Sequence, residues 1–362
     1  MKTSTLFRLI VMVTLVAAMA FAAPPATTNM TTGKADLKSA GPLSFGPDGI
    51  LFIGDSLGAQ IVAIDTGDNG SASGSSLDVK GLDGKIAAAL GTSADQILIH
   101  DVAVNPVSKN VYVSVQRGKG ADGIPVIVRL DASGKLAEVR LDNVKHSAAS
   151  LPNAPADTKG ARSPRLDTIT EVRYVNGKVL VAGLSNEEFS SNMRAIPFPF
   201  EKVDSGASIE MYHGSHGRFE TNSPVRTFLP YSINNQQYIL AAYTCTPLVK
   251  IPVSDLKGGA KIKGTTIAEL GAGNRPIDMI AYKKNGKDFI LMANSARGVM
   301  KLDAAHLDTY KPITAPTDIT GVPYETVKDW TGVQHLKQFD DKQALVMSQT
   351  GGSTDLRTVA LP

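Results

Sequence analysis

Polar and ionisable residues recur at two equivalent places in six copies of one short sequence pattern. Each copy has an apolar run, a turn and a second apolar run, so these residues would stand where neighbouring strands end. If they converge, they could bind a divalent cation or a polar, anionic small molecule. They could equally satisfy turn backbones, because Asp and Asn are ordinary turn formers. The positions before the first run are His100, Asp101, Asp167, Arg226, Arg275 and Asp278, and those after the second run are Asp55, Gln116, Arg117, Asn186, Glu187, Thr244, Asn294 and Gln349.

Adjacent carboxylates stand beside an amide in Asn186-Glu187-Glu188. Two carboxyl groups that lie close together can split their pKa values and divide acid from base work. Neighbouring residues of a strand face opposite sides, however, so one of the two carboxylates would face solvent. Glu187 is therefore a candidate catalytic residue, and Asp101, Asn186 and Glu187 are candidate metal ligands.

Two histidines lie three residues apart in His213-Gly214-Ser215-His216-Gly217. A turn at the glycines could let both imidazoles bind zinc or copper, although the sequence offers no third His or Cys nearby. The other interpretation is a glycine-rich loop with surface histidines. If this face is functional, His213 and His216 are candidates for proton transfer. Cys245, the only cysteine, is more typical of an inert buried thiol than of a nucleophile.

The six copies predict an all-β fold of short strands, arranged as a β-propeller. They begin near Leu43, Asp101, Ile169, Arg226, Ile277 and Val333. Asn-Gly turns, as in copies three and five, are strong hairpin signals. Six blades fit the chain, and seven would require the segment 136–144 or 208–220 to form a blade of its own. We expect the last run to pair with residues just before Leu43 and so close the ring.

Two segments depart from the repeat. Asp83 to Leu90 predicts a short helix that ends before Gly91 and lies over the junction of the first two blades. The stretch from Asn186 to Glu220 is longer than a blade turn requires and reads as an insertion. Function in propellers often lies on such an inserted face.

The N-terminal residues predict export. Lys2 and Arg8 precede an apolar run, and Ala20-Phe21-Ala22 fits a cleavage site, so residues 1–22 read as a signal peptide. Residues 23–41 read as a flexible lead-in and 42–362 as one propeller domain. Without Lys2 and Arg8, 35 of the 37 basic residues remain against 34 acidic ones. This balance favours neither nucleic acid nor an anionic membrane as a partner. No later segment predicts a membrane span.

The segment from Phe45 to Asp55, FGPDGILFIGD, resembles the blade motif of the gluconolactonase-like and NHL-repeat six-bladed propellers. That group includes metal-dependent sugar lactonases, extracellular esterases and protein-binding propellers. The lactonases hold a central divalent cation with a Glu, an Asn and an Asp from different blades. Ala40 stands in this chain where those enzymes begin with Glu, which disfavours the lactonase interpretation.

These observations favour a periplasmic or extracellular binding module, with an unknown small molecule or protein as its partner. The alternative is a metal-dependent lactonase- or esterase-type hydrolase with a cation, calcium or zinc, in the central channel. A redox partner that binds metal at the histidines is a third hypothesis. The predicted ligand-binding residues are His100, Asp101, Asp167, Asn186, Arg226, Arg275 and Asp278.

Overall fold

A computed structural model describes residues 25–362 of the chain, apart from 73–75 and 121. The predicted signal peptide lies outside the described residues. Within them, no helix is both long enough and apolar enough to cross a membrane.

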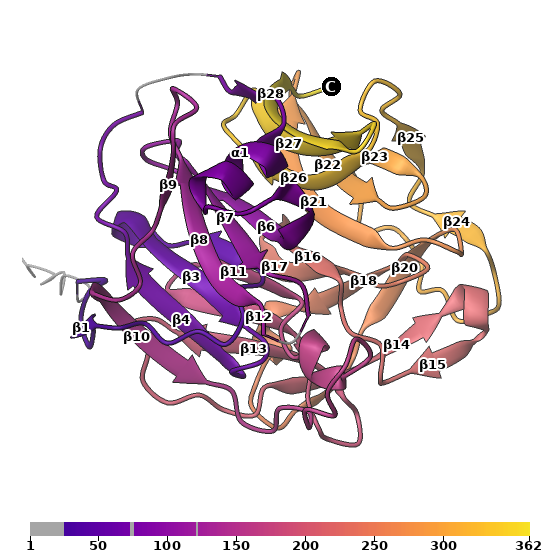
Figure 1. The fold of residues 1–362 in the computed structure, drawn as a ribbon. Coiled ribbons are helices and arrows are strands. Elements are labelled where there is room, and N and C mark those ends of the chain that lie inside the picture. The colour runs from indigo at the N-terminus through magenta and orange to yellow at the C-terminus, as the bar shows by residue number, and fades with distance from the viewer. Residues whose placement is uncertain (1–24, 73–75, 121) are drawn as a thin grey trace, which may run out of the picture.

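The described chain forms a six-bladed β-propeller, as the repeat predicted (Figure 1). The first sheet contains β2 (Leu43–Phe45), β3 (Ile50–Asp55) and β4 (Gln60–Asp65), with β10 (Val144–Ser150) and β1 (Thr31–Gly33) outside them. The second contains β6 (Ile97–Val104), β7 (Val111–Arg117), β8 (Ile124–Leu130) and β9 (Leu136–Glu138). The third contains β11 (Glu171–Val175), β12 (Lys178–Leu184), β13 (Ser191–Pro197), β14 (Ala207–His213) and β15 (Arg218–Glu220), and β19 (Lys261–Lys263) runs parallel to β14.

The remaining three sheets follow the order of the chain. The fourth contains β16 (Thr227–Ile233), β17 (Gln236–Ala242), β18 (Pro247–Pro252), β20 (Thr265–Leu270) and β24 (Ile319–Gly321). The fifth contains β21 (Pro276–Lys284), β22 (Lys287–Asn294), β23 (Gly298–Asp303) and β25 (Tyr324–Thr326). The sixth contains β26 (Val333–Gln338), β27 (Gln343–Thr350), β28 (Ser353–Ala360) and the distant β5 (Asp78–Val79). One α-helix, α1 (Leu82–Ala89), and the short 3-10 turns η1 (Pro47–Gly49), η2 (Ala94–Gln96), η3 (Pro164–Asp167), η4 (Gly214–His216) and η5 (Val253–Asp255) complete the described elements.

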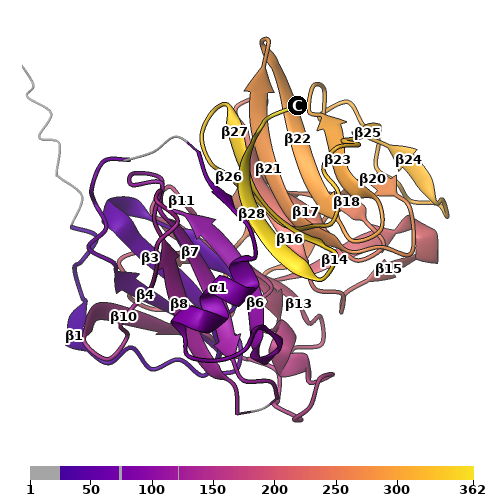
Figure 2. The ribbon, with the colours of Figure 1, turned by 45° about the horizontal axis from the view of Figure 1, so that its top comes forward.

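The order of sheets around the ring differs from their order in the sequence. The innermost strand of the first sheet, β2, contacts β6 on one side and β11 on the other, while β6 also contacts β26. The second sheet therefore lies between the sixth and the first. After β4 the chain crosses to the sixth sheet, builds the second, and returns to the first as β10 before it enters the third. Figure 2 shows β6, β7 and β8 beside β3 and β4, with β28 across from α1.

Apolar side chains between neighbouring sheets hold the ring together. Val113 and Leu130 of the second sheet pack with Leu345 and Leu356 of the sixth, and an equivalent cluster fills each of the other five junctions in the described chain. Full burial of one such side chain stabilises the fold by about 1.5–3 kcal/mol. Because both faces of each sheet are covered, the strands read as nearly continuous apolar runs, such as ILFIG in β3.

The prediction for ring closure was wrong. β28 pairs with β5, at Leu356 with Val79 and Arg357 with Asp78, and not with residues just before Leu43. The predicted helix is confirmed as α1, and Gly91 follows it with φ +66°. However, α1 packs on the sixth and second sheets, because its buried side chains join the cluster between them. The expected position over the first and second sheets was therefore also wrong.

Three other segments can also be compared with the expectations. The stretch from Asn186 to Glu220 is not an added insertion, because it contributes the regular strands β13 and β14 together with the hairpin strand β15. Residues 136–144 likewise contain the outer strand β9, so no seventh sheet forms in the described chain. Residues 25–41, expected to be flexible, pack on the first sheet. There β1 pairs with β10, and Ala35 and Ala40 are buried.

Candidate functional site

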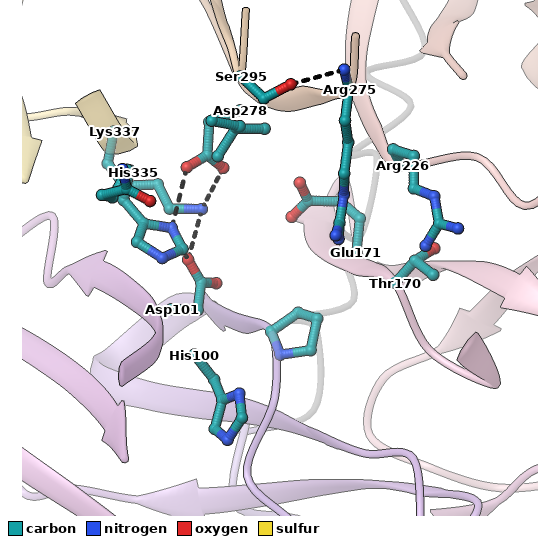
Figure 3. Close-up of a pocket in the computed structure, with 13 residues that line it drawn as sticks. His100, Asp101, Thr170, Glu171, Arg226, Arg275, Asp278, Ser295, His335 and Lys337 are labelled. Atoms are coloured by element: carbon teal, nitrogen blue, oxygen red, sulfur yellow. Dashed lines mark hydrogen bonds and ion pairs between the residues drawn. The ribbon is translucent and has the colours of Figure 1, made fainter. Parts of the chain in front are cut away.

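A polar pocket of about 330 Å³ opens at one end of the central channel. Apart from Ser295, which follows β22, its walls come from the innermost strands or from the residues just before them, which is where the repeat places its first set of polar positions (Figure 3). Five of the seven predicted ligand-binding residues line it: His100, Asp101, Arg226, Arg275 and Asp278. Glu171, His335 and Lys337 line it as well, although they are not among the residues predicted from the sequence.

Bulges in three innermost strands direct side chains into this pocket. The ladder of β6 with β7 shifts between Ile99 and Asp101, that of β21 with β22 between Pro276 and Asp278, and that of β26 with β27 between Val333 and His335. A bulge adds one residue to a strand and re-aims the side chains beside it. The extra residues, His100, Ile277 and Gln334, all line the pocket. The same irregularity is thus used three times to build one site.

Two carboxylates and two cations form a buried cluster on the pocket floor. The Lys337 ammonium lies 2.9 Å from Asp101 Oδ1 and 2.7 Å from Asp278 Oδ1. His335 Nδ1 lies 3.3 Å from Asp101 Oδ1 and 3.2 Å from Asp278 Oδ2. Backbone amides complete the shell, because Asp101 accepts from Leu43 N and Asp278 accepts from Leu336 N. The cluster joins the second sheet to the fifth and sixth sheets across the channel.

The charges of this cluster stabilise one another. Burial alone would raise the pKa of Asp101 and of Asp278, but Lys337 and His335 hold both pKa values below the ordinary range. Burial alone would lower the pKa of His335, but hydrogen bonds to the two carboxylates raise the pKa of His335 to about 9. The same carboxylates raise the pKa of Lys337. At neutral pH the cluster therefore holds two negative and two positive charges.

The position between Asp101 and Asp278 is already filled by a cation of the chain itself. Asp101, Asp278 and His335 place ligand atoms within 4.8 Å of one another, as a metal site would require. The Lys337 ammonium, however, lies within hydrogen-bond distance of both carboxylates. A divalent ion would have to displace it and bring further positive charge beside His335. The arrangement stabilises the channel without a metal.

The rim of the pocket is basic. Arg226 Nη1 donates to Asp167 Oδ1 at 2.8 Å, which places Asp167 at the rim beside the pocket. Arg275 is exposed, and its guanidinium makes no hydrogen bond or ion pair with any described residue. Burial of part of its side chain, together with the neighbouring charge of Arg226, lowers the pKa of Arg275. Figure 3 shows both arginine side chains on the side of the pocket opposite Lys337.

Glu171 contributes a further carboxyl group from β11. Thr227 Oγ1 donates to Glu171 Oε2 at 2.9 Å, and Arg173 Nη2 lies 3.7 Å from the same oxygen. Burial raises the pKa of Glu171 above its usual value. The inner channel therefore has ionisable groups from the second, third, fifth and sixth sheets, with the most exposed positive charge at its mouth.

Asn186 and Glu187 do not join this pocket. Asn186 donates its backbone N–H to Asn153 O, and Glu187 accepts hydrogen bonds from Asn153 Nδ2 at 2.8 Å and Ser208 Oγ at 3.3 Å. Asp101, the third predicted metal ligand, is held by Lys337 on the channel floor. The structure therefore does not bring the three predicted metal ligands together.

His213 and His216 form a separate cluster at the outer end of the third sheet. Their imidazole rings lie 3.8 Å apart, and both donate Nδ1–H to the Glu220 carboxylate. No third His or Cys stands near them in the sequence. The tertiary fold brings Cys245, 29 positions or more along the chain, to the two histidines.

The residues missed on the pocket floor did have a weak signal. In VQHLKQ, the first run of the sixth copy, His335 and Lys337 stand on either side of the buried Leu336, so they share one face of β26. In β26 that face lines the pocket. Polar residues inside the first runs, and not only before them, would have been the better selection.

Comparisons with known proteins identify no family for this chain. No protein-family model matches the chain, and no curated protein matches its sequence. Similar solved structures include a putative glucose dehydrogenase from Thermus thermophilus (12% identity, 91% of this chain and 100% of that one, TM-score 0.37). They also include a PQQ-bound aldose sugar dehydrogenase from Streptomyces coelicolor (12%, 93% and 99%, TM-score 0.35) and the apo-form of one from Escherichia coli (11%, 92% and 99%, TM-score 0.32). Likeness at this level carries no argument about cofactor or reaction.

Proposed function

We propose that the protein is an exported binding module that takes a small anionic molecule at the mouth of the propeller channel. The main support is the guanidinium of Arg275, which has no partner among the described residues. It lies beside Arg226, above the buried cluster whose two negative and two positive charges cancel. Carboxylate and phosphate oxygens are the natural partners of a guanidinium, because its planar N–H groups can donate two parallel hydrogen bonds. The chemistry of the rim thus fits a carboxylate or a phosphate group.

The floor of the pocket supports the same function. Asp101 and Asp278 are neutralised by Lys337 and His335, so a ligand anion above them meets little net repulsion. His100 and Ser295 add polar groups at the wall. A pocket of about 330 Å³ has the size of a small-molecule site rather than of a protein interface.

Titration calorimetry of the wild-type protein with gluconate, citrate and inorganic phosphate tests the proposal, with glucose as the neutral comparison. The substitutions Arg275→Ala and Arg226→Ala both remove hydrogen bonds to the charged ligand. Each such hydrogen bond contributes about 1.5–3 kcal/mol. We therefore expect the affinity for the bound anion to fall at least about tenfold in each variant. Arg140→Ala is the matched control, because Arg140 is a surface arginine paired only with Asp142.

Two outcomes contradict the proposal. Glucose could bind as tightly as gluconate, or the bound anion could keep its affinity in both rim variants. Raising the salt concentration provides a further check, since ionic contacts at an exposed rim weaken with screening.

The hydrolase alternative, implied by the resemblance of the Phe45 to Asp55 segment, gains no support from this pocket. It requires a cation in the channel, where Lys337 now bridges Asp101 and Asp278. Assay of a panel of lactones with and without added calcium or zinc decides the matter. Metal-dependent cleavage that is lost in Asp278→Asn would favour the hydrolase over the binding module.

Export is the remaining part of the proposal, and it rests on the sequence of residues 1–22. Expression of the full chain in a bacterium, followed by fractionation and N-terminal sequencing, tests it. We expect the released protein to begin at Ala23. Protein that stays in the cytoplasm with Met1 or Lys2 at its start would contradict the export proposal but leave the pocket proposal standing.

A further inference from the structure

The cluster at His213, His216 and Cys245 lies outside the channel pocket and is not used by the proposed function. His213 ends β14, His216 lies in the turn η4, and Cys245 follows β17 of the next sheet. One candidate ligand atom from each residue lies within 4.8 Å of the others. The three residues therefore meet where the third and fourth sheets join.

One carboxylate fixes both imidazoles. Glu220 Oε2 lies 3.0 Å from His213 Nδ1, and Glu220 Oε1 lies 2.7 Å from His216 Nδ1. Ser223 Oγ donates to the same carboxylate at 2.7 Å. A carboxylate that accepts from Nδ1–H holds the ring in the tautomer whose Nε2 carries a free lone pair. This is the usual arrangement of an imidazole that binds a metal through Nε2.

The second nitrogen of His213 has no partner in the described chain. The His213 side chain is only 2% exposed, and its Nε2 is buried without a hydrogen bond. A buried polar atom without a partner costs about 1–3 kcal/mol, so such atoms are rare in folded proteins. The hydrogen bond to Glu220 explains Nδ1 but leaves Nε2 unexplained. A ligand that accepts the Nε2 lone pair accounts for both nitrogens.

We propose that His213, His216 and Cys245 bind a divalent transition metal, with zinc as the natural occupant. Two imidazoles and one thiolate are soft and borderline ligands, which suit zinc or copper and do not suit calcium or magnesium. Around one tetrahedral zinc ion, such ligand atoms lie about 3.3–3.8 Å apart. The candidate ligand atoms lie within 4.8 Å of one another, so metal binding requires side-chain rotations that bring them closer together.

The site leaves one coordination position open. Three protein ligands are present, and zinc in proteins normally takes four. The His216 side chain is 43% exposed and Cys245 is half-buried, so a water molecule can reach the ion from solvent. Binding releases the thiol proton of Cys245, because the thiolate is the ligand form. Glu220 is a positioning residue that holds both rings.

Cobalt provides the first test, since Co²⁺ takes zinc sites and absorbs visible light. Tag-free apoprotein is titrated with Co²⁺ under reducing conditions, and we expect one equivalent to produce tetrahedral d–d bands and a thiolate charge-transfer band in the near ultraviolet. Zinc should then remove both. In Cys245→Ser the charge-transfer band should vanish, and His216→Ala should weaken zinc binding at least about 100-fold.

The single cysteine provides an independent readout. Because Cys245 is the only thiol in the chain, its reaction with a disulfide reagent such as dithiobis(nitrobenzoate) reports this site alone. Stoichiometric Zn²⁺ should slow that reaction in the wild type. Glu220→Gln keeps one acceptor oxygen and should weaken zinc binding about 10–100-fold, the range typical for groups that orient a metal-binding imidazole.

His306→Asn is the matched control, because His306 is exposed and lies in a loop far along the chain from the cluster. Far-ultraviolet circular dichroism must show each variant folded. If His213→Ala fails to fold, the exposed His216 and the half-buried Cys245 still decide the result. The proposal is overturned if Zn²⁺ leaves the thiol reaction unchanged, or if His216→Ala and Cys245→Ser bind cobalt like the wild type.

Discussion

Replacement of Lys337 by methionine tests the interpretation of the channel floor. The ammonium lies 2.9 Å from Asp101 and 2.7 Å from Asp278, and the Lys337 side chain is 12% exposed. Methionine keeps the length and volume of the stem but removes the charge. The variant would leave two buried carboxylates with only His335 as a counter-charge.

The expected loss is large for a single substitution. Removal of one partner from a buried ion pair costs about 3–5 kcal/mol, mainly because the other charge stays buried without compensation. The entropy of unfolding is about 2.1 cal/mol/K per residue near 60 °C, so a chain of 362 residues loses roughly 1.3 °C of Tm per kcal/mol. We expect Lys337→Met to lower Tm by about 4–7 °C at pH 7.

Urea and thermal unfolding at pH 7 and pH 4 provide the assay. Without Lys337 the pKa values of Asp101 and Asp278 should rise, so protonation near pH 4 should relieve part of the loss. Lys283→Met is the control, since Lys283 pairs with Asp288 on the surface and should change stability by less than about 0.5 kcal/mol. A loss below about 1 kcal/mol at pH 7, or an equal loss at both pH values, would refute the argument.

Three further predictions concern the same fold. Free imidazole titrates near 6.5, and His335 has a pKa of about 9 in the folded protein; its stabilisation is therefore complete below about pH 6.5 and lost as pH rises to 9. In urea unfolding, the wild type should have a clearly higher midpoint than His335→Asn at pH 6, and the difference should be smaller at pH 9. A difference that is larger at pH 9 than at pH 6 would be inconsistent with this. Ile86→Ala in α1 should destabilise by about 2–5 kcal/mol, because Ile86 is fully buried. Exposed Lys85→Ala, its control in urea unfolding, should change little, and equal losses would disprove the packing argument. Gly183→Ala should cost about 1–3 kcal/mol, because a Cβ there would overlap the backbone carbonyl of Thr168. Gly70→Ala meets open space, so a similar loss of Tm in both variants would count against that reason.

The number of sheets and most of their strands could be predicted, because both depend on local sequence patterns. Each hairpin has its own turn signal, and in the structure Asn176 and Gly177 have φ values of +48° and +79°, while Asn285 and Gly286 have +52° and +77°. These are the positive φ values that favour Asn-Gly in tight hairpins. The first apolar runs could likewise be recognised as innermost strands from alternation and length alone.

The arrangement of the sheets could not be predicted in the same way. β5 contains two residues, Asp78 and Val79, and neither its length nor its composition marks it as a strand of the sixth sheet. The sequence of β10 likewise contains no signal that the chain returns to the first sheet there. Pairings of this kind are decided by the packing of whole sheets, which leaves no periodic trace in the segment itself.

The sites show the same division. Polar groups at the channel could be selected because they recur at equivalent places, and Asp101 and Asp278 do meet there. Cys245 and His213 do not share such a place in the repeat. Their proximity depends on how the end of one sheet meets a turn of the next, so it is visible only in three dimensions.

Closure by β5 also has a consequence for how the chain folds. Leu77 N bonds to Thr358, a partner 281 positions later, so the ring cannot close until nearly all of the chain has been made. The first sheet and the second sheet are complete once β10 (Val144–Ser150) has been made, but β5 and the outer side of the second sheet lack their partners in the sixth sheet until the last strands appear. Contacts between such distant residues slow folding, because a long loop must be ordered first. We expect one cooperative transition late in synthesis, and removal of the last strand should leave no stable five-sheet remainder.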